Sequence, residues 1–176
     1  SLGYSARLVL DPTLLISSTQ WKEFFKIKSV DKSYVFYYQL QDTFDIDKIR
    51  KFSEIHNCDL KIISGKSKSF DSSSDIYSIE NPKQFLELLS NAKYVCTSSF
   101  HGLAFALLYH KQFYSSFNKL DRAYSLLSSL GLLNRLIEPK ADFSYEDIEI
   151  DYNSVDDKLN KLRDESLSYL LEQCEF

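Results

Sequence analysis

The sequence predicts an α/β fold with one doubly wound, mainly parallel sheet and helices on both faces. First, short β-branched and aromatic runs alternate with helix-patterned segments about five times along the chain. Second, residues 34–40 are almost all strand formers, which is typical of a strand buried on both faces. Third, 176 residues that are 44% hydrophobic suffice for one domain with a sizeable core. Right-handed crossovers between parallel strands then place helices on both faces.

Strands and helices are assigned from apolar runs and their spacing. Strands are expected at runs that end in turn-forming residues: 7–10, 34–40, 60–64, 76–79, 94–97 and 112–116. Helices are expected where apolar residues recur every three or four positions: 13–27 (one helix or two short turns), 46–56, 84–90, 102–110, 122–130 and an amphipathic C-terminal helix at 154–173. Asn81 and Pro82 supply an N-cap and a first-turn proline, and Gly131 ends the helix before it. The serine-rich stretch 66–75 predicts a mobile loop, and residues 1–176 form one predicted domain.

The composition argues against several classes of protein. A net charge of −4 disfavours a nucleic-acid-binding face, although it leaves room for a local basic pocket for a phosphorylated ligand. Cys58, Cys96 and Cys174 match no zinc or redox spacing and indicate a reducing, cytoplasmic setting. His101 and His110 fall on opposite faces of one predicted helix, so we expect no metal site. The sequence contains no signal peptide, no membrane-spanning apolar run and no Met, and we expect it to be a fragment or a processed chain.

The stretch 93–105 predicts a strand, a tight turn and a helix, with polar residues at the turn. The strand ends in Ser98 and Ser99, and His101 and Gly102 follow. Ligands bind at the carboxyl ends of strands in such sheets, and helix N-termini attract anions. His101 is therefore a candidate general acid or base, and the serines and the Gly102 backbone are candidate ligands of a phosphate or carboxylate. Structural alternatives stay open: helix capping by the histidine or the serines, and a glycine that a tight turn requires.

Three charged residues outside this turn are further candidates. Lys119 and Arg122 lie just before and at the start of a predicted helix, and Arg122 could clamp an anion in bidentate fashion. The alternative for Arg122 is an ion-paired or solvated first-turn residue, which the residue types favour. Asp11 is expected to end the first strand and cap the following helix, and contact across a domain cleft is its weaker functional interpretation.

Several segments together resemble the polysaccharide pyruvyl transferase family. The most specific of them is TSSFHGLAF at 97–105. The others keep a family-like order and spacing from about residue 9 to residue 171: VLDPTLL at 9–15 with Trp21, YVFYY at 34–38, and the segments 82–86, 92–95, 111–113 and 122–132. Leu103 and Ala106 depart from the pattern, since a small polar residue and a serine are common at these positions in such sequences.

The resemblance implies a GT-B-like enzyme with two Rossmann-like domains, of which this chain would be the C-terminal one, and an N-terminal domain as its partner. Such enzymes transfer pyruvate from phosphoenolpyruvate, without a cofactor, to sugar hydroxyls of a surface polysaccharide or its lipid-linked precursor. By this resemblance His101 protonates the donor, and a set of neighbouring residues binds the substrate: Ser98, Ser99, Gly102, Arg122 and Lys119. The resemblance also implies a cytoplasmic location, with membrane contact through a lipid-linked acceptor. Two alternatives stay open: a GT-B glycosyltransferase that uses a nucleotide sugar, and a non-catalytic binding domain of a polysaccharide assembly system.

Overall fold

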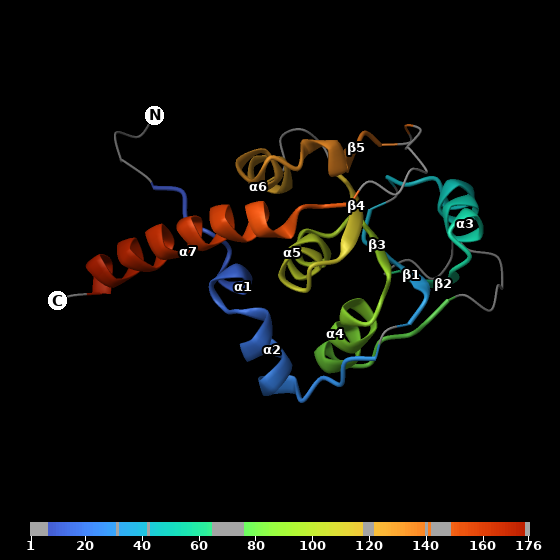
Figure 1. The fold of residues 1–176 in the computed structure, drawn as a ribbon, viewed down its shortest axis with the longest axis horizontal. Coiled ribbons are helices and arrows are strands. Elements are labelled where there is room, and N and C mark those ends of the chain that lie inside the picture. The colour runs from blue at the N-terminus through green and yellow to red at the C-terminus, as the bar shows by residue number, and fades with distance from the viewer. Residues whose placement is uncertain are drawn as a thin grey trace.

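A five-stranded parallel sheet forms the centre of the molecule (Figure 1). The computed structural model describes residues 7–30, 32–41, 43–64, 76–117, 122–139, 141 and 149–174; the predicted loop 66–75 and Lys119 lie outside them. The strand order is β2-β1-β3-β4-β5, and every neighbouring pair is parallel. The strands are β1 (Tyr34–Gln39), β2 (Asp59–Ser64), β3 (Tyr94–Thr97), β4 (Gln112–Ser116) and β5 (Leu136–Ile137). The predicted α/β class with a parallel sheet is confirmed.

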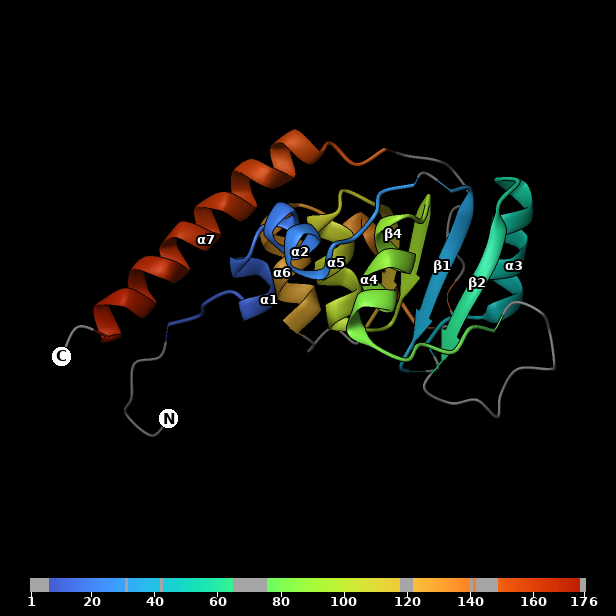
Figure 2. The same cartoon turned by 90° about the horizontal axis from the view of Figure 1, so that it is seen from below.

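Helices cover both faces of the sheet, but unequally (Figure 2). Among the described α-helices, α3 (Ile46–Ile55) alone packs on one face, where its Ile49 and Phe52 belong to one core cluster with Val35 and Tyr37 of β1. The larger core lies on the other face. It is built with α1 (Pro12–Leu15), α2 (Ser18–Phe25), α4 (Pro82–Ser90), α5 (Phe100–Leu108), α6 (Arg122–Leu130) and α7 (Tyr152–Cys174). Helix α5 is the centre of this core, since all its residues from Gly102 onward are buried.

The order in which strands are added to the sheet reverses between β1 and β3. The chain leaves β1 through α3 to reach β2 on one side, then crosses back through α4 to β3 on the other. Connections from the two neighbouring strands therefore diverge to opposite faces, which opens a crevice at their carboxyl ends. The turn at residues 98–101 lies at this point, because Tyr38 of β1 is paired with Thr97, the last residue of β3.

Three sequence predictions differ from the structure. Residues 7–10 form no strand; they run beside α7, where the Leu10 backbone N–H donates to the Ser166 hydroxyl at 3.0 Å, so a side chain replaces a strand neighbour. Residues 76–79 do not form the predicted strand; only Ile76 pairs with the sheet, in a single bridge opposite Ile62. Strand β5 was not predicted, because two residues are too short for a periodic signal.

The remaining boundaries lie close to the predicted ones. Residues 13–27 form two helices, and Ser17 begins the second with a reciprocal capping box to Gln20. Asn81 caps α4 with Pro82 in its first turn, and Gly131 follows α6 with φ of 76°.

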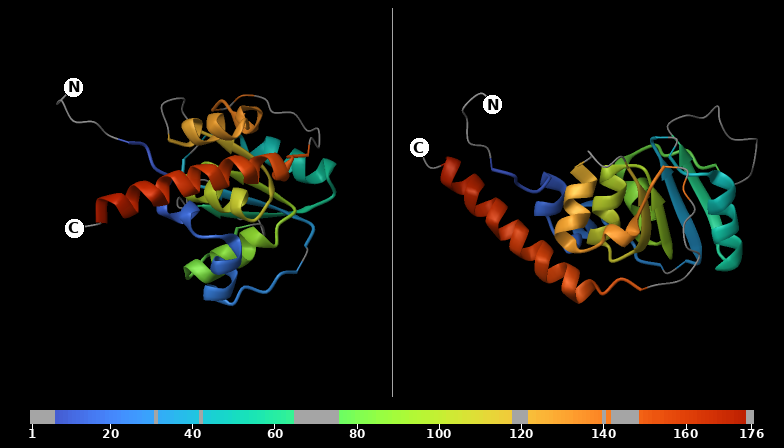
Figure 3. Two further views of the ribbon diagram at one scale, coloured as in Figure 1. Left: turned by 60° about the vertical axis from the view of Figure 1, so that its left-hand side comes forward. Right: turned by 90° about the horizontal axis from the view of Figure 1, so that it is seen from above.

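Helix α7 projects beyond the sheet at its C-terminal end (Figure 3). Its first half packs on α6 and α1 through the buried Val155 and Leu159. Farther along, Leu167, Leu170 and Leu171 are exposed. None of the described helices combines the length and apolar character needed to cross a bilayer.

Candidate functional site

The turn between β3 and α5 is held in place by its own side chains. The Thr97 hydroxyl donates to the Tyr38 carbonyl at 3.0 Å and accepts from the Ser99 N–H at 3.0 Å. Ser99 is the N-cap of α5, and its hydroxyl accepts from the Gly102 N–H at 3.4 Å. The turn is therefore rigidly joined to β1, and α5 begins at the carboxyl edge of the sheet.

His101 is the exposed residue of this turn. It lies in the first turn of α5, and 55% of its side chain is accessible to solvent. Its Nε2 atom is 4.0 Å from Oδ1 of Asp11, in the segment before α1. The structure thus places an accessible imidazole beside a carboxylate at the carboxyl edge, as the hypothesis of a general acid requires.

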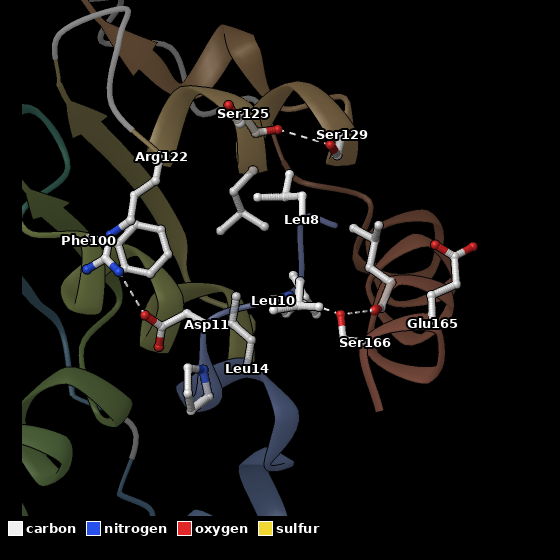
Figure 4. Close-up of a pocket in the computed structure, with 14 residues that line it drawn as sticks. Leu8, Leu10, Asp11, Leu14, Phe100, Arg122, Ser125, Ser129, Glu165 and Ser166 are labelled. Atoms are coloured by element: carbon white, nitrogen blue, oxygen red, sulfur yellow. Dashed lines mark hydrogen bonds and ion pairs between the residues drawn. The ribbon is translucent and has the colours of Figure 1, made fainter. Parts of the chain in front are cut away.

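Arg122 reaches the same carboxylate from the start of α6. Its Nη1 atom donates to Oδ2 of Asp11 at 2.9 Å, and its guanidinium lies 3.8 Å from the centre of the Phe100 ring (Figure 4). The ion pair and the cation–π contact fix the direction of a side chain that is otherwise 58% exposed. Residues 101 and 122, predicted as separate parts of one site, are therefore joined through Asp11.

Asp11 was predicted mainly as a helix cap, and its contacts with Arg122 and His101 were not predicted from the sequence. Its predicted role as a helix cap is confirmed, since its side chain accepts from the Thr13 N–H at 3.0 Å. Burial tends to raise the pKa of this carboxyl, but the hydrogen bonds from Thr13 and the charges of His101 and Arg122 outweigh burial and lower the pKa. Asp11 is thus a fixed anion between two basic side chains. The sequence signal, an Asp-Pro-Thr cap, carries no information about basic groups so far along the chain.

Two hollows flank this group. The edge pocket, of about 590 Å³, lies at the carboxyl ends of β1 and β2 and is bordered by His101 and Ser99. Aromatic and polar side chains share its wall, among them Tyr38, Tyr77, Asn81, Phe85 and Phe105. The apolar pocket, of about 380 Å³, is lined by Phe100 and Arg122 and by residues of the N-terminal segment, α1, α6 and α7, among which leucine is the commonest (Figure 4).

Ser98 and Gly102 have internal tasks in the structure. The Ser98 hydroxyl accepts from the N–H groups of Leu40 and Gln41, each at 3.0 Å, and donates to the Gln41 carbonyl. A Cβ atom on Gly102 would lie 2.4 Å from Oγ1 of Thr97, so close helix–strand packing accounts for this glycine. Substrate contact by Ser98, Ser99 and Gly102 stays a prediction, and so does substrate contact by Lys119.

Replacing Ser98 with alanine is expected to lower the free energy of unfolding by about 1–3 kcal/mol, because it removes three hydrogen bonds that join this turn to the backbone of Leu40 and Gln41. Urea denaturation measures the loss, and Ser168→Ala, at an exposed position of α7, is the control. Unchanged stability with weaker substrate binding would instead make Ser98 a substrate ligand.

Other reactive side chains do not extend the site. Cys96, one residue before the end of β3, is fully buried, and burial raises the pKa of its thiol to about 12, so it packs as a small apolar residue. His110 lies apart from His101 and pairs with Asp156. Within the described part of the chain, no three His, Cys, Asp or Glu residues are grouped as metal ligands.

Two solved structures are similar to the chain at 14% sequence identity. The UDP-GlcNAc 2-epimerase of Methanocaldococcus jannaschii, solved with UDP-GlcNAc and UDP, has a TM-score of 0.42 over 81% of this chain and 41% of its own. The glycosyltransferase SnogD of Streptomyces nogalater has a TM-score of 0.38 over 93% of this chain and 44% of its own. The chain thus spans less than half the length of either protein. No protein of curated function matches the chain.

The family comparison covers most of the chain. The model of the polysaccharide pyruvyl transferase family matches residues 1–116, a span that contains β1 to β4, Asp11 and His101. The match ends before α6, so Arg122 is placed in the site by the structure and not by the family model. On this match, the chain belongs to the polysaccharide pyruvyl transferase family.

Proposed function

We propose that this chain binds phosphoenolpyruvate and protonates it, as the donor-binding part of a pyruvyl transferase that acts on saccharide hydroxyls. The observation that supports this most is the convergence of His101 and Arg122 on one carboxylate at the carboxyl edge of the sheet. A proton donor and an anion-binding guanidinium are the two groups that this donor requires.

The reaction divides between the two substrates. The protonated His101 delivers a proton to the methylene carbon, so that a C–H bond forms and positive charge develops at the carbon that bears the phosphate. A sugar hydroxyl attacks that carbon and forms a C–O bond, and its proton returns to the imidazole. A second hydroxyl of the acceptor then forms another C–O bond while the bond to the phosphate oxygen breaks, and the proton of this hydroxyl leaves with the phosphate. Inorganic phosphate leaves, and a pyruvate ketal remains on the sugar.

Each substrate has a place in this proposal. Arg122 binds the carboxylate or phosphate of the donor, because its half-exposed guanidinium has more N–H donors than the contact with Asp11 uses. The saccharide acceptor occupies the edge pocket, where aromatic side chains and the Asn81 side chain line a space of about 590 Å³. This volume exceeds that of the small donor and falls in the range of ligand sites. The pocket borders His101, so the acceptor hydroxyls meet the protonated donor.

We further propose that the site is completed by a second Rossmann-like domain, as the family resemblance implies. The group formed by Asp11, His101 and Arg122 is open to solvent on the side of the imidazole and the guanidinium, so a second domain facing it would exclude water from the donor. The free thiols of Cys58, Cys96 and Cys174 support a cytoplasmic enzyme. A lipid-linked acceptor would bring it to the membrane surface.

A thermal-shift experiment on the complete natural protein tests the proposal. Phosphoenolpyruvate at about 100 times its Kd is expected to raise Tm by several degrees, whereas UDP-GlcNAc leaves Tm unchanged. Incubation with acceptor polysaccharide should then release inorganic phosphate and form the ketal, detected by NMR.

The opposite results separate the alternatives. A rise in Tm with the nucleotide sugar alone identifies a glycosyltransferase. Binding of saccharide without release of phosphate identifies a non-catalytic binding domain.

A further inference from the structure

We infer that Asp11 is a positioning residue of this site, whose carboxylate holds the Arg122 guanidinium and the His101 imidazole in the arrangement that receives an anionic donor. The inference rests on the proposed function and deepens it. Asp11 itself does not touch the donor; it acts through the two basic side chains.

The two carboxylate oxygens have separate tasks. Oδ2 accepts from Arg122 at 2.9 Å, and Oδ1 accepts from the Thr13 N–H at 3.0 Å and lies 4.0 Å from Nε2 of His101. The backbone hydrogen bond fixes the plane of the carboxylate relative to α1. One carboxylate therefore binds the guanidinium from α6 directly and lies within ion-pair distance of the imidazole from α5.

The Asp11 side chain is much more buried than those of His101 and Arg122. Only 12% of the Asp11 side chain is exposed, against 55% for His101 and 58% for Arg122. A ligand from solvent meets the imidazole and the guanidinium first, with the carboxylate behind them. An anion could not approach Asp11 favourably, but it is attracted to the two basic groups in front of it.

The charges around this group favour the same arrangement. The Asp11 carboxylate compensates the repulsion between Arg122 and a protonated His101, and its lowered pKa keeps it ionised near neutral pH. Glu80, Tyr38 and Tyr77 line the edge pocket together with His101, and Glu165 lines the apolar pocket with Arg122. Within the described ranges of the chain, Asp11 is the acidic residue that contacts the guanidinium.

Removal of the Asp11 carboxylate would leave the Arg122 side chain less well ordered, because its contact with Phe100 would remain and its contact with Asp11 would not. Its guanidinium is held between the Asp11 oxygen and the Phe100 ring at 3.8 Å. Without the carboxylate one of these two contacts is missing, so a long and exposed side chain gains conformers that do not face the donor. Binding of phosphoenolpyruvate must then order it again, which weakens affinity.

Asp11→Asn in the complete protein tests the inference, because asparagine caps a helix as well as aspartate does but carries no charge. We expect a KM for phosphoenolpyruvate about 10-fold higher, since a charge-assisted hydrogen bond is lost, and a lower kcat, since the imidazole loses its neighbour. Asp45→Asn is the matched control: Asp45 caps α3 with the same bond to the residue two positions on, at 3.0 Å, on the other face of the sheet. Equal Tm values of the two variants show that the fold is retained.

A double-mutant cycle with Arg122→Gln separates positioning from a general effect. If Asp11 acts through Arg122, Asp11→Asn should raise KM far less in the Arg122→Gln protein than in the natural one. Additive effects, or kinetic constants of Asp11→Asn equal to those of Asp45→Asn, would overturn the inference while leaving pyruvyl transfer intact. A natural protein that neither binds phosphoenolpyruvate nor releases phosphate would overturn the proposed function itself.

Discussion

Replacing His101 with asparagine is expected to lower kcat for pyruvyl transfer by about 10²–10⁴-fold, because the proposed site then loses the group that delivers the proton to the methylene carbon. The KM for phosphoenolpyruvate should change little, since the anion is bound mainly by Arg122 in the proposed site. Asparagine is compatible with the first turn of α5 and fits in the space of the half-exposed imidazole. Phosphate release under saturating donor and acceptor measures the loss.

His110→Asn is the matched control for this experiment. His110 is 51% exposed, close to the 55% of His101, and its Nε2 atom also faces an aspartate, Asp156, at 3.1 Å. It follows α5 and borders a hollow lined by residues from the amino ends of β3 and β4, at the opposite edge of the sheet from His101. Its backbone φ of 52° is one that asparagine tolerates. A variant at position 101 that kept more than a tenth of kcat would contradict the acid role, whatever the control does.

The elements near the site could be predicted because their signals are local. The strand runs at 94–97 and 112–116 are bounded by polar or turn-forming residues, and the structure has both strands at these positions. The contact that joins the site could not be predicted in this way. Asp11 and Arg122 lie 111 positions apart, and their meeting depends on how α6 packs beside the N-terminal segment. The ion pair that the residue types favoured for Arg122 does exist, but its partner makes it part of the candidate site.

Leu103 and Ala106, the two residues that depart from the family pattern, lie in the hydrophobic core. Leu103 and Ala106 are both fully buried in the core on the α5 side of the sheet. A hydroxyl at either position would face apolar neighbours, whereas His101 on the same helix faces solvent. The exchange of polar for apolar residues therefore changes core packing and leaves the group formed by Asp11, His101 and Arg122 as it is.

Gly102→Ala is expected to lower the free energy of unfolding by about 1–3 kcal/mol, the usual effect of overfilling a packed site. The added methyl group would lie 2.4 Å from Oγ1 and 3.1 Å from Cβ of Thr97, and 3.2 Å from Cδ1 of Tyr38. Thr97 cannot move aside without loss, because its hydroxyl bonds both the Tyr38 carbonyl and the Ser99 N–H. Thermal and urea denaturation measure the effect.

The sign of this effect is diagnostic, because helix propensity alone predicts the opposite result. Glycine to alanine inside a helix normally stabilises a protein by about 0.5–1 kcal/mol, and Gly102 lies in the first turn of α5. A stabilised Gly102→Ala variant would show that Thr97 yields and that the helix can move away from β3. If the clash governs, the double variant Thr97→Ala with Gly102→Ala should be destabilised by less than the sum of the two single changes, since removing the Thr97 hydroxyl opens the space that the methyl group needs. Helix α5 positions His101, so the single variant Gly102→Ala should also lower the rate of phosphoenolpyruvate turnover, and more so the farther the start of the helix is displaced.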